Sequence, residues 1–298
     1  MNELGPVVRA DDTVAIFGGP YSNLEATQAF FEEMARLGIP SERVICTGDV
    51  VAYCADAAAT TALVRASGCR VVMGNVEENL AAGAADCGCG FEEGSTCDRL
   101  SMAWFAHATA QVSADDRAWM GRLPRRIQLE IGGYRFAVVH GGVDAINQTI
   151  YASTDAAIKT TEIGKTGLDG VIGGHCGLPF TQCVGAGLWH NSGALGMPAN
   201  DGTPRVWFSV FRRANDGLAI EHRALHYDHA TAAAKMRRAG LPEGYAAALG
   251  SGILASADTL PTAEHSAGGV PLRESQVLFR RTSPEGSPLQ RAWPVPAA

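Results

Sequence analysis

The sequence predicts an α/β fold built on a parallel sheet, and two features of the pattern support this prediction. Over the first half of the 298-residue chain, short apolar runs alternate with stretches of helical spacing. Parallel strands need a crossover connection, so repeated strand–helix–strand units indicate a parallel sheet covered by helices. Over the second half the pattern changes to consecutive strands, which predicts hairpins.

The first half predicts three strands and four helices. Apolar runs at 13–17, 43–49 and 69–75 predict the strands. Apolar residues at helical spacing cover 23–38 and 55–68, and both stretches end on a glycine, as helices commonly do. Two more helices are expected, one near 101–110 and one that begins at "SADD", where residues 113 and 116 have capping-box spacing.

The second half predicts strands followed by a helix and an arm. Residues 125–142 predict a hairpin with its turn at 132–133, and residues 205–225 predict another with its turn at 215–217. Residues 170–193 continue the strand character, and residues 229–249 predict a helical stretch. We therefore expect one domain over 1–249, with a cysteine-rich insert at 85–98. Residues 250–298 are rich in Gly, Pro, Ser and Ala, and predict an extended arm that packs on the domain or toward a partner.

Composition restricts the partners and the location. The net charge is −7 and the pI about 5.6, which gives no electrostatic drive toward nucleic acid or an anionic membrane. No apolar run is long enough to span a bilayer, and the first residues lack the pattern of a signal peptide. We expect a cytoplasmic protein that acts on a small molecule, with the arm as a site for homo-oligomer formation.

Four of the predicted strands end in a polar residue next to glycine. These residues are Asp49, Asn75, His140 and His175. In open α/β sheets, ligands bind outside the carboxyl ends of the strands, and glycine lets the backbone approach closely. One carboxylate, one amide oxygen and two imidazoles form a suitable ligand set for Zn, Mn or Fe. The sequence therefore predicts a site for one transition-metal ion.

The order of these motifs resembles that of the calcineurin-like metallophosphoesterases, in particular the small bacterial branch. "GD", "GN", "HG" and "GH" followed by "LPF" carry the resemblance, which extends over residues 13–224. It implies a four-layer sandwich of two mixed β-sheets flanked by helices, with two metal ions at one edge. It also implies that Asp49 bridges the two ions and that Asn75, His140 and His175 bind the second. Asn23 and Asn191, which lie in matching stretches, are expected to bind substrate.

The chain departs from this family where the first metal ion would bind. The family's Asp-x-His motif is replaced by Gly19 and Tyr21, and the last histidine of its Gly-His-x-His motif is Gly177. We therefore predict a single ion, with the Tyr21 hydroxyl facing the vacated space. The histidine that assists the leaving group in the family is Val76 here. We expect the following glutamates, Glu77 and Glu78, to act only through helix-terminus electrostatics.

The remaining candidates are cysteines. Cys87, Cys89 and Cys97 lie in a glycine-rich insert, and Cys54 or Cys176 would supply a fourth thiolate for a structural zinc ion. One interpretation is that these thiolates bind a second ion near the vacated position. The other is that the insert closes on its own zinc or disulfide and forms a lid. Cys176 is the cysteine expected at the active centre, and we predict catalytic roles for Cys176 and Tyr21.

Three functions remain open at this point. The first is a metal-dependent hydrolase that acts on a phosphate ester or related small substrate through one ion. The second is a non-haem iron or thiolate-containing enzyme for redox or sulfur chemistry on the same scaffold. The third is a non-catalytic metal-binding sensor, because the chain has lost three metal ligands and the leaving-group histidine.

Overall fold

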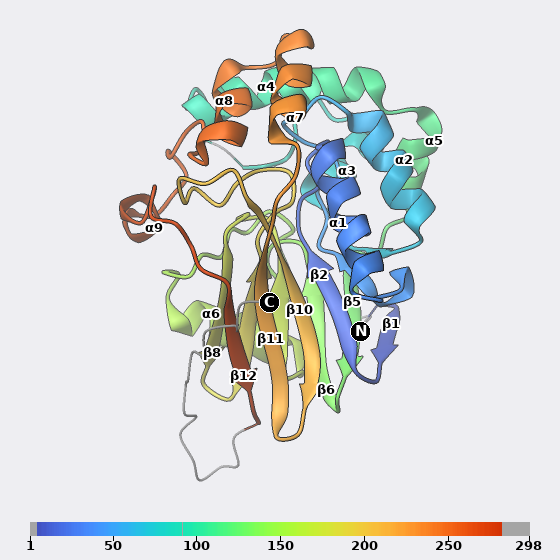
Figure 1. Ribbon diagram of the computed structural model, residues 1–298, viewed down its shortest axis with the longest axis vertical. Helices are drawn as coiled ribbons and strands as arrows, with labels where there is room; N and C mark the ends of the chain where they lie inside the picture. Colours follow the sequence, from blue (N-terminus) through green and yellow to red (C-terminus); the bar gives the residue numbers. More distant parts are fainter. Residues whose placement is uncertain (1–4, 91, 282–298) are drawn as a thin grey trace.

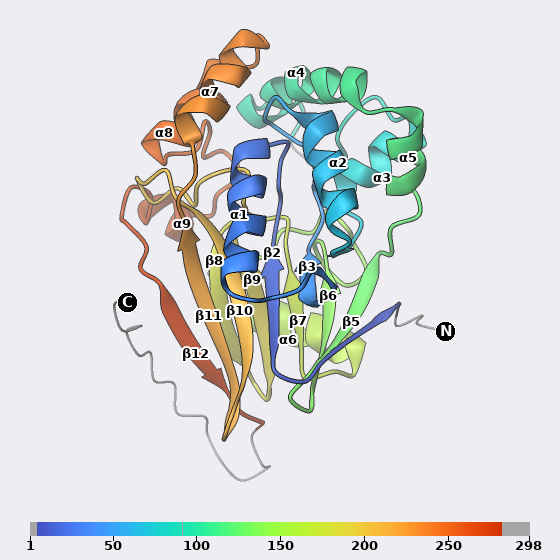
Figure 2. The same ribbon diagram turned by 45° about the vertical axis from the view of Figure 1, so that its right-hand side comes forward.

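The fold is a sandwich of two six-stranded mixed sheets with helices on both outer faces. A computed structural model describes residues 5–90 and 92–281. The first sheet has the strand order β1-β5-β6-β7-β9-β8, and the second has the order β12-β11-β10-β2-β3-β4. Figure 1 and Figure 2 show the two sheets packed face to face, with α1 and α2 over one outer face and α6 over the other. This arrangement confirms the predicted four-layer sandwich.

The first sheet is built mainly from the middle of the chain. Its strands are β1 (Val7–Ala10), β5 (Arg126–Ile131), β6 (Tyr134–Val139), β7 (Gly170–Gly173), β8 (Pro179–Val184) and β9 (Gly187–Ser192). The strands β5 and β6 are antiparallel, which confirms the hairpin predicted at Gly132–Gly133. The pairs β6–β7 and β7–β9 are parallel, so the ends of these strands point to the same edge.

The second sheet joins both ends of the chain. Its strands are β2 (Thr13–Phe17), β3 (Val44–Cys46), β4 (Arg70–Val71), β10 (Val206–Ala214), β11 (Gly217–Leu225) and β12 (Ser275–Phe279). The strands β2, β3 and β4 are parallel, as the strand–helix–strand pattern predicts. The hairpin of β10 and β11 confirms the second predicted turn, and β12 adds an antiparallel strand beside β11.

The helices mostly follow the predicted spacing. They are α1 (Leu24–Arg36), the short 3-10 helix η1 (Ser41–Arg43), α2 (Ala57–Ser67), α3 (Asn75–Ala82), α4 (Thr96–Gln111), α5 (Ala114–Met120), α6 (Ala156–Thr166), α7 (His229–Arg238), α8 (Glu243–Ser251) and α9 (Thr262–Ser266). The helix α5 begins at the predicted cap, where the Ser113 side chain accepts a hydrogen bond from the Asp116 amide. The sequence did not predict β1 or α6, and the stretch predicted at 229–249 is two helices separated at Gly240–Pro242.

The apolar core lies in three layers that match this architecture. Between the sheets, the buried residues include Ile16, Phe136 and Phe211. A larger cluster lies between the second sheet and its helices, with Phe17 and Phe30 in ring contact at 4.4 Å between centroids. A smaller cluster joins the first sheet to α6 through Ile163. Each sheet therefore buries both of its faces, which explains the nearly continuous apolar runs of its central strands.

The predicted domain boundary at residue 249 is revised by the structure. The helix α8 continues past it to Ser251, and the following segment packs on the domain before β12 completes the second sheet (Figure 1). Phe279 of β12 is buried and lies 5.4 Å from the ring of Tyr134, centroid to centroid. The described part of the arm, up to residue 281, is therefore part of the folded domain. A role of the arm in homo-oligomer formation stays a prediction.

Candidate metal centre

The four predicted metal ligands meet at one edge of the sandwich. Asp49 lies in the loop after β3, and Asn75 is the first residue of α3 after β4. His140 directly follows β6, and His175 follows β7. The two sheets supply two ligands each, so the face-to-face packing of the sheets brings the four side chains together.

Nε2 of His140 is the atom on which the other ligand atoms converge. It lies 3.0 Å from Asn75 Oδ1, 3.1 Å from His175 Nδ1 and 3.2 Å from Asp49 Oδ2. Among the described residues, Asp49, His140 and His175 are the one group of three His, Cys, Asp or Glu side chains at metal-binding spacing. All four side chains are buried or nearly so, which keeps bulk water from competing for the site.

Hydrogen bonds outside the group decide which atoms face its centre. His140 donates its Nδ1–H to the Thr47 carbonyl over 2.7 Å, so in the neutral ring Nε2 carries a lone pair. Asn75 donates its Nδ2–H to the Cys87 carbonyl over 2.9 Å, so its Oδ1 faces inward. With His140 neutral, its Nε2 and Asn75 Oδ1 both direct a lone pair toward the Asp49 carboxylate. Burial lowers the pKa of His140 but Asp49 raises it by more, so a proton and a cation compete for the Nε2 lone pair. Such a donor set fits a cation, and an outer hydrogen bond of this kind is usual for metal-binding histidines.

The ligand loops have backbone conformations that few residues adopt. Asp49 has φ 53° and His175 has φ 60°, both in the left-handed region. Strained backbone of this kind concentrates at functional sites, where the surrounding packing holds it. Gly74 is required for a related reason, since a Cβ atom there would lie 2.2 Å from Oδ1 of Asp49.

The pKa shifts of Asp49 and His175 favour the protonation states that bind a metal ion. Burial raises the pKa of Asp49, but the neighbouring His140 and His175 lower it by more, so the net shift is downward. Burial and the neighbouring His140 lower the pKa of His175 to about 4, so this ring is neutral near pH 7. Asp49 therefore presents a carboxylate and His175 a free lone pair, which are the forms that bind metal.

Glu77 has a structural part in the site that the sequence analysis did not assign to it. Its Oε2 accepts hydrogen bonds from the amides of Asp49 (2.7 Å) and Gly74 (3.0 Å). It is fully buried, and burial together with Asp49 raises its pKa to about 7. Glu77 therefore caps α3 and also holds the Asp49 loop. The sequence signal was its position at the third residue of α3 after a glycine cap.

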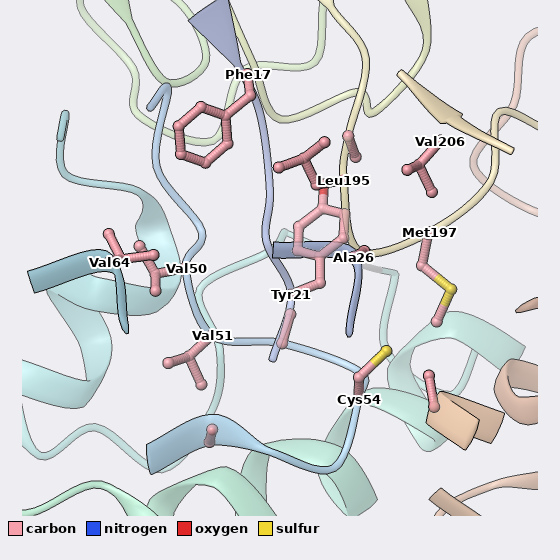
Figure 3. Packing of buried hydrophobic residues seen from close by; sticks show 14 of the residues in the cluster. Phe17, Tyr21, Ala26, Val50, Val51, Cys54, Val64, Leu195, Met197 and Val206 are labelled. Carbon is pink, nitrogen blue, oxygen red and sulfur yellow. The ribbon is translucent and has the colours of Figure 1, made fainter. Parts of the chain in front are cut away.

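Tyr21 fills the space near the lost ligand positions. A Cβ atom on Gly19 would lie 2.2 Å from Cζ of the Tyr21 ring, and one on Gly177 would lie 3.6 Å from its hydroxyl. The ring thus lies close to both Gly19 and Gly177, the positions where the resemblance implies ligands of a first ion. Figure 3 shows it packed near Leu195 in the apolar cluster. Burial, Asp49 and Cys176 raise its pKa well above the ordinary value, so its phenol keeps the proton.

A cavity of about 300 Å³ opens beside the ligand group. Asp49, His175, Tyr21 and Cys176 all contribute to its wall. Val76, which replaces the family's leaving-group histidine, also lines it. Burial raises the pKa of the Cys176 thiol to about 12, so it stays neutral, and its Sγ accepts a hydrogen bond from Asn191 Nδ2 over 3.1 Å.

The two asparagines predicted to bind substrate are engaged elsewhere. Asn23 caps α1 by accepting a hydrogen bond from the Ala26 amide, and its Nδ2–H groups donate to the Gly196 carbonyl and the Tyr227 hydroxyl. Asn191 donates to the Gly174 carbonyl at 2.7 Å and accepts from the Gly193 amide. Neither residue lines the cavity. We therefore correct both predictions: these amides hold the loops around the site rather than a substrate.

The cysteines do not form the predicted second metal site. Cys87 and Cys89 are joined in a disulfide, and Cys54 is buried with its Sγ 3.6 Å from the Gly196 carbonyl oxygen. Within residues 5–90 and 92–281, no group of three ligands at metal-binding spacing includes a cysteine. The prediction of an ion at Cys54, Cys87, Cys89 and Cys97 is therefore wrong, and the alternative of a disulfide-closed insert agrees with the structure. Cys89 and Cys97 line the cavity.

Comparison with known proteins agrees with the fold and shows the family. Residues 14–211 match the calcineurin-like phosphoesterase superfamily domain, and this chain belongs to that family. A metallophosphoesterase from Sphaerobacter thermophilus has a similar structure, with a TM-score of 0.62, 22% identity, and coverage of 82% of this chain and 100% of that one. A hypothetical protein from Pyrococcus horikoshii has a TM-score of 0.68 at 16% identity, covering 81% of this chain and 99% of that one. No protein of curated function matches significantly in sequence.

The helices give one further observation. Among those in the described residues, none combines the length and the apolar character that crossing a membrane requires.

Proposed function

We propose that this protein is a metal-dependent phosphoesterase that works with a single ion held by Asp49, Asn75, His140 and His175. The observation that carries the proposal is the convergence of three ligand atoms within 3.0–3.2 Å of His140 Nε2. A bound Zn, Mn or Fe ion would supply a Lewis acid that polarises a phosphoryl oxygen. The bulk of Tyr21 beside Gly19 and Gly177 supports one ion rather than two.

The chain's own residues have defined parts in this proposal. His140 is fixed by the Thr47 carbonyl, and Asp49 by the Glu77 carboxylate that binds its amide. Tyr21 faces the cavity with a protonated hydroxyl, which makes it the candidate to donate a proton to the leaving oxygen where the family uses a histidine. Cys176 lines the same cavity as a neutral thiol and limits its polar surface.

The test measures metal content and hydrolysis in parallel. The double variant Asp49→Asn/His175→Ala should lose the ion, since it removes a charge and an imidazole, and should lose hydrolysis of a model phosphodiester with it. Its matched control is Asp144→Asn/His265→Ala, which changes the same residue types at exposed positions. Retention of both metal and activity in the first variant would refute the proposal.

A redox or sulfur-handling centre is the second candidate. The observation in its favour is the Cys176 thiol, which borders the cavity directly after the ligand His175. Two imidazoles and one carboxylate also suit non-haem iron. Metal analysis and iron spectroscopy on protein purified without oxygen separate the two candidates, because a zinc or manganese protein that cleaves phosphodiesters excludes the second. Tight metal binding with no turnover of any substrate would instead indicate a sensor.

A further inference from the structure

The wall of the cavity outside the ligand group is aromatic and aliphatic. Tyr53 packs against Tyr21 at 4.9 Å and against Tyr245 at 5.0 Å, centroid to centroid, so these rings form one continuous surface. Met197 and Leu254 line the cavity as well. Rings and aliphatic groups of this kind bind an apolar body by removing its surface from water.

The described residues that line the cavity include no Lys or Arg, and Asp49 is their only carboxylate. The buried lysine of this region, Lys159, is committed elsewhere, since its Nζ donates to the carbonyls of Ala152 and Thr154 and to the Gln182 side chain. The phenol of Tyr151 is also committed, because it donates to the Thr259 carbonyl at 3.1 Å. The described lining residues therefore offer no cationic side chain to neutralise an anion. That role falls to the ion that we propose at the ligand group, which forms the floor of the cavity.

The absence of Lys and Arg from the described lining residues defines the ligand. A singly charged phosphodiester group leaves the least negative charge for the proposed ion to offset. A phosphomonoester dianion or a polyphosphate would leave excess negative charge in an apolar enclosure that already holds Asp49 with Glu77 next to it, which is costly. Tyr21, which lines the cavity, adds its phenol hydroxyl as one neutral hydrogen-bond donor.

We infer that the substrate is a singly charged phosphodiester with a bulky aryl or branched apolar body, and not a phosphomonoester or nucleoside polyphosphate. This inference rests on the proposed function for the ion that binds the phosphoryl group. The apolar body lies against Tyr53 and Tyr245, under a roof supplied by Leu254 and Leu260 of the arm. The arm, which lies beyond the family-matched region, thus determines specificity.

Calorimetric binding to metal-loaded protein tests the inference without turnover. The probes are diphenylphosphinate, a monoanion with two rings; dimethylphosphinate, a monoanion with none; and phenylphosphonate, a dianion in mildly alkaline buffer. Diphenylphosphinate should bind at least about tenfold more tightly than either of the others, because only it satisfies both the charge and the apolar wall. Equal or tighter binding of phenylphosphonate overturns the charge argument, and equal binding of dimethylphosphinate overturns the apolar body.

A cation placed in the roof provides the second arm of the test. Leu254→Arg should improve the binding of phenylphosphonate relative to diphenylphosphinate by about tenfold, since it adds the missing positive charge. Ile253→Arg is the matched control, because this neighbour is 42% exposed and does not line the cavity, and it should leave the ratio unchanged. Thermal unfolding checks that both variants fold. The same ratio in both variants would contradict the inferred roof.

The two proposals fail in different ways. Metal-loaded protein that prefers diphenylphosphinate yet hydrolyses no phosphodiester would overturn the proposed function and leave the ligand class intact. Hydrolysis that favours nucleotides or phosphomonoesters would overturn the ligand class alone. A protein that takes up no divalent ion would overturn both.

Discussion

At the scale of single residues, the ligands differ in what holds them. His140 and Asn75 are each oriented by a hydrogen bond to a backbone carbonyl, from Thr47 and Cys87 respectively. Asp49 is oriented through its own amide, which donates to Glu77. His175 depends on its left-handed backbone and its neighbour His140. A substitution near the site can therefore move a candidate ligand without replacing it.

The Tyr21→Phe variant separates proton donation from metal binding. The ring that packs between Gly19 and Gly177 is kept, so metal content should not change. Loss of the only neutral donor we assign at the leaving oxygen should reduce kcat by about a hundredfold. Steady-state kinetics with a model phosphodiester and parallel metal analysis check this. An unchanged kcat would show that the hydroxyl takes no part, and Tyr53→Phe serves as the control for losing a cavity phenol.

The Glu77→Ala variant tests the support of the Asp49 loop. It leaves the buried amides of Asp49 and Gly74 without an acceptor, which should lower the free energy of unfolding by about 2–4 kcal/mol. It should also weaken metal binding, because the loop is no longer fixed. Urea unfolding and metal titration measure the two effects. Glu78→Ala, which removes only a partly exposed partner of Arg125, should cost at most about 1 kcal/mol, and equal losses would contradict this role.

At the scale of elements, the hairpins β8–β9 and β10–β11 enclose a buried polar pair. The rings of His190 and His222 stack at 4.9 Å, and the Thr181 hydroxyl lies 2.8 Å from His190 Nδ1 and 2.7 Å from His222 Nε2. Burial lowers the pKa of both rings, to about 4 for His222. Both are therefore neutral in the fold, where they join the two sheets by hydrogen bonds rather than by apolar packing.

This pair should make the fold sensitive to acid. The unfolded chain has ordinary histidines with a pKa of about 6.5, so it binds protons that the folded state excludes. Stability is then complete above about pH 6.5 and falls as the pH drops toward about 4. For His222 the loss amounts to about 3 kcal/mol. Denaturant titration between about pH 6.5 and pH 4 checks this prediction. In the His222→Gln variant the free energy of unfolding should decrease by about 3 kcal/mol less than in the wild type. In the control His226→Gln, at an exposed position, the decrease should equal that of the wild type.

At the scale of the whole molecule, the segment after the family-matched region completes both the sheet and the cavity. The strand β12 pairs with β11, while residues between α8 and α9, such as Leu254 and Leu260, line the cavity wall. The segment therefore contributes both to the second sheet and to the cavity wall. Among the described strands, β12 stands at the edge of the second sheet.

Phe279→Ala tests whether the arm belongs to the core. The ring is 2% exposed and contacts Tyr134 and Phe136, so its removal leaves a cavity between the sheets. We expect a loss of about 3–5 kcal/mol in the free energy of unfolding, measured by denaturant titration. Val270→Ala, at a site that is 62% exposed, should change it by less than about 0.5 kcal/mol. A small loss for Phe279→Ala would show that β12 is detached in solution.

The sequence by itself determined the architecture and the candidate ligand set. The apolar runs identified the central strands because these bury both faces, and the hairpins were identified because each turn requires glycine or a polar residue. The four ligands were identified because they directly follow strands whose ends must share an edge. The loss of the family's first ion at Gly19, Tyr21 and Gly177 stays a prediction, and the structure adds that the Tyr21 ring lies beside both glycines.

Only the tertiary structure decided what surrounds those ligands. The roles of Asn23, Asn191 and Glu77 depend on partners far away in the chain, such as Gly196, Gly174 and Asp49, and local spacing carries no information about them. The pairing of the cysteines also depends on distances between segments that the sequence does not give. In the structure Cys54 contacts the Gly196 carbonyl, whereas Cys87 and Cys89 of the insert bond to each other. The arm shows no periodicity in its sequence. Its short helix and strand are stabilised by contacts with the rest of the domain, and their own residue pattern is too short to predict them. The order of strands along the chain therefore identified the candidate ligands. Contacts between distant segments determined which other residues surround them and line the cavity.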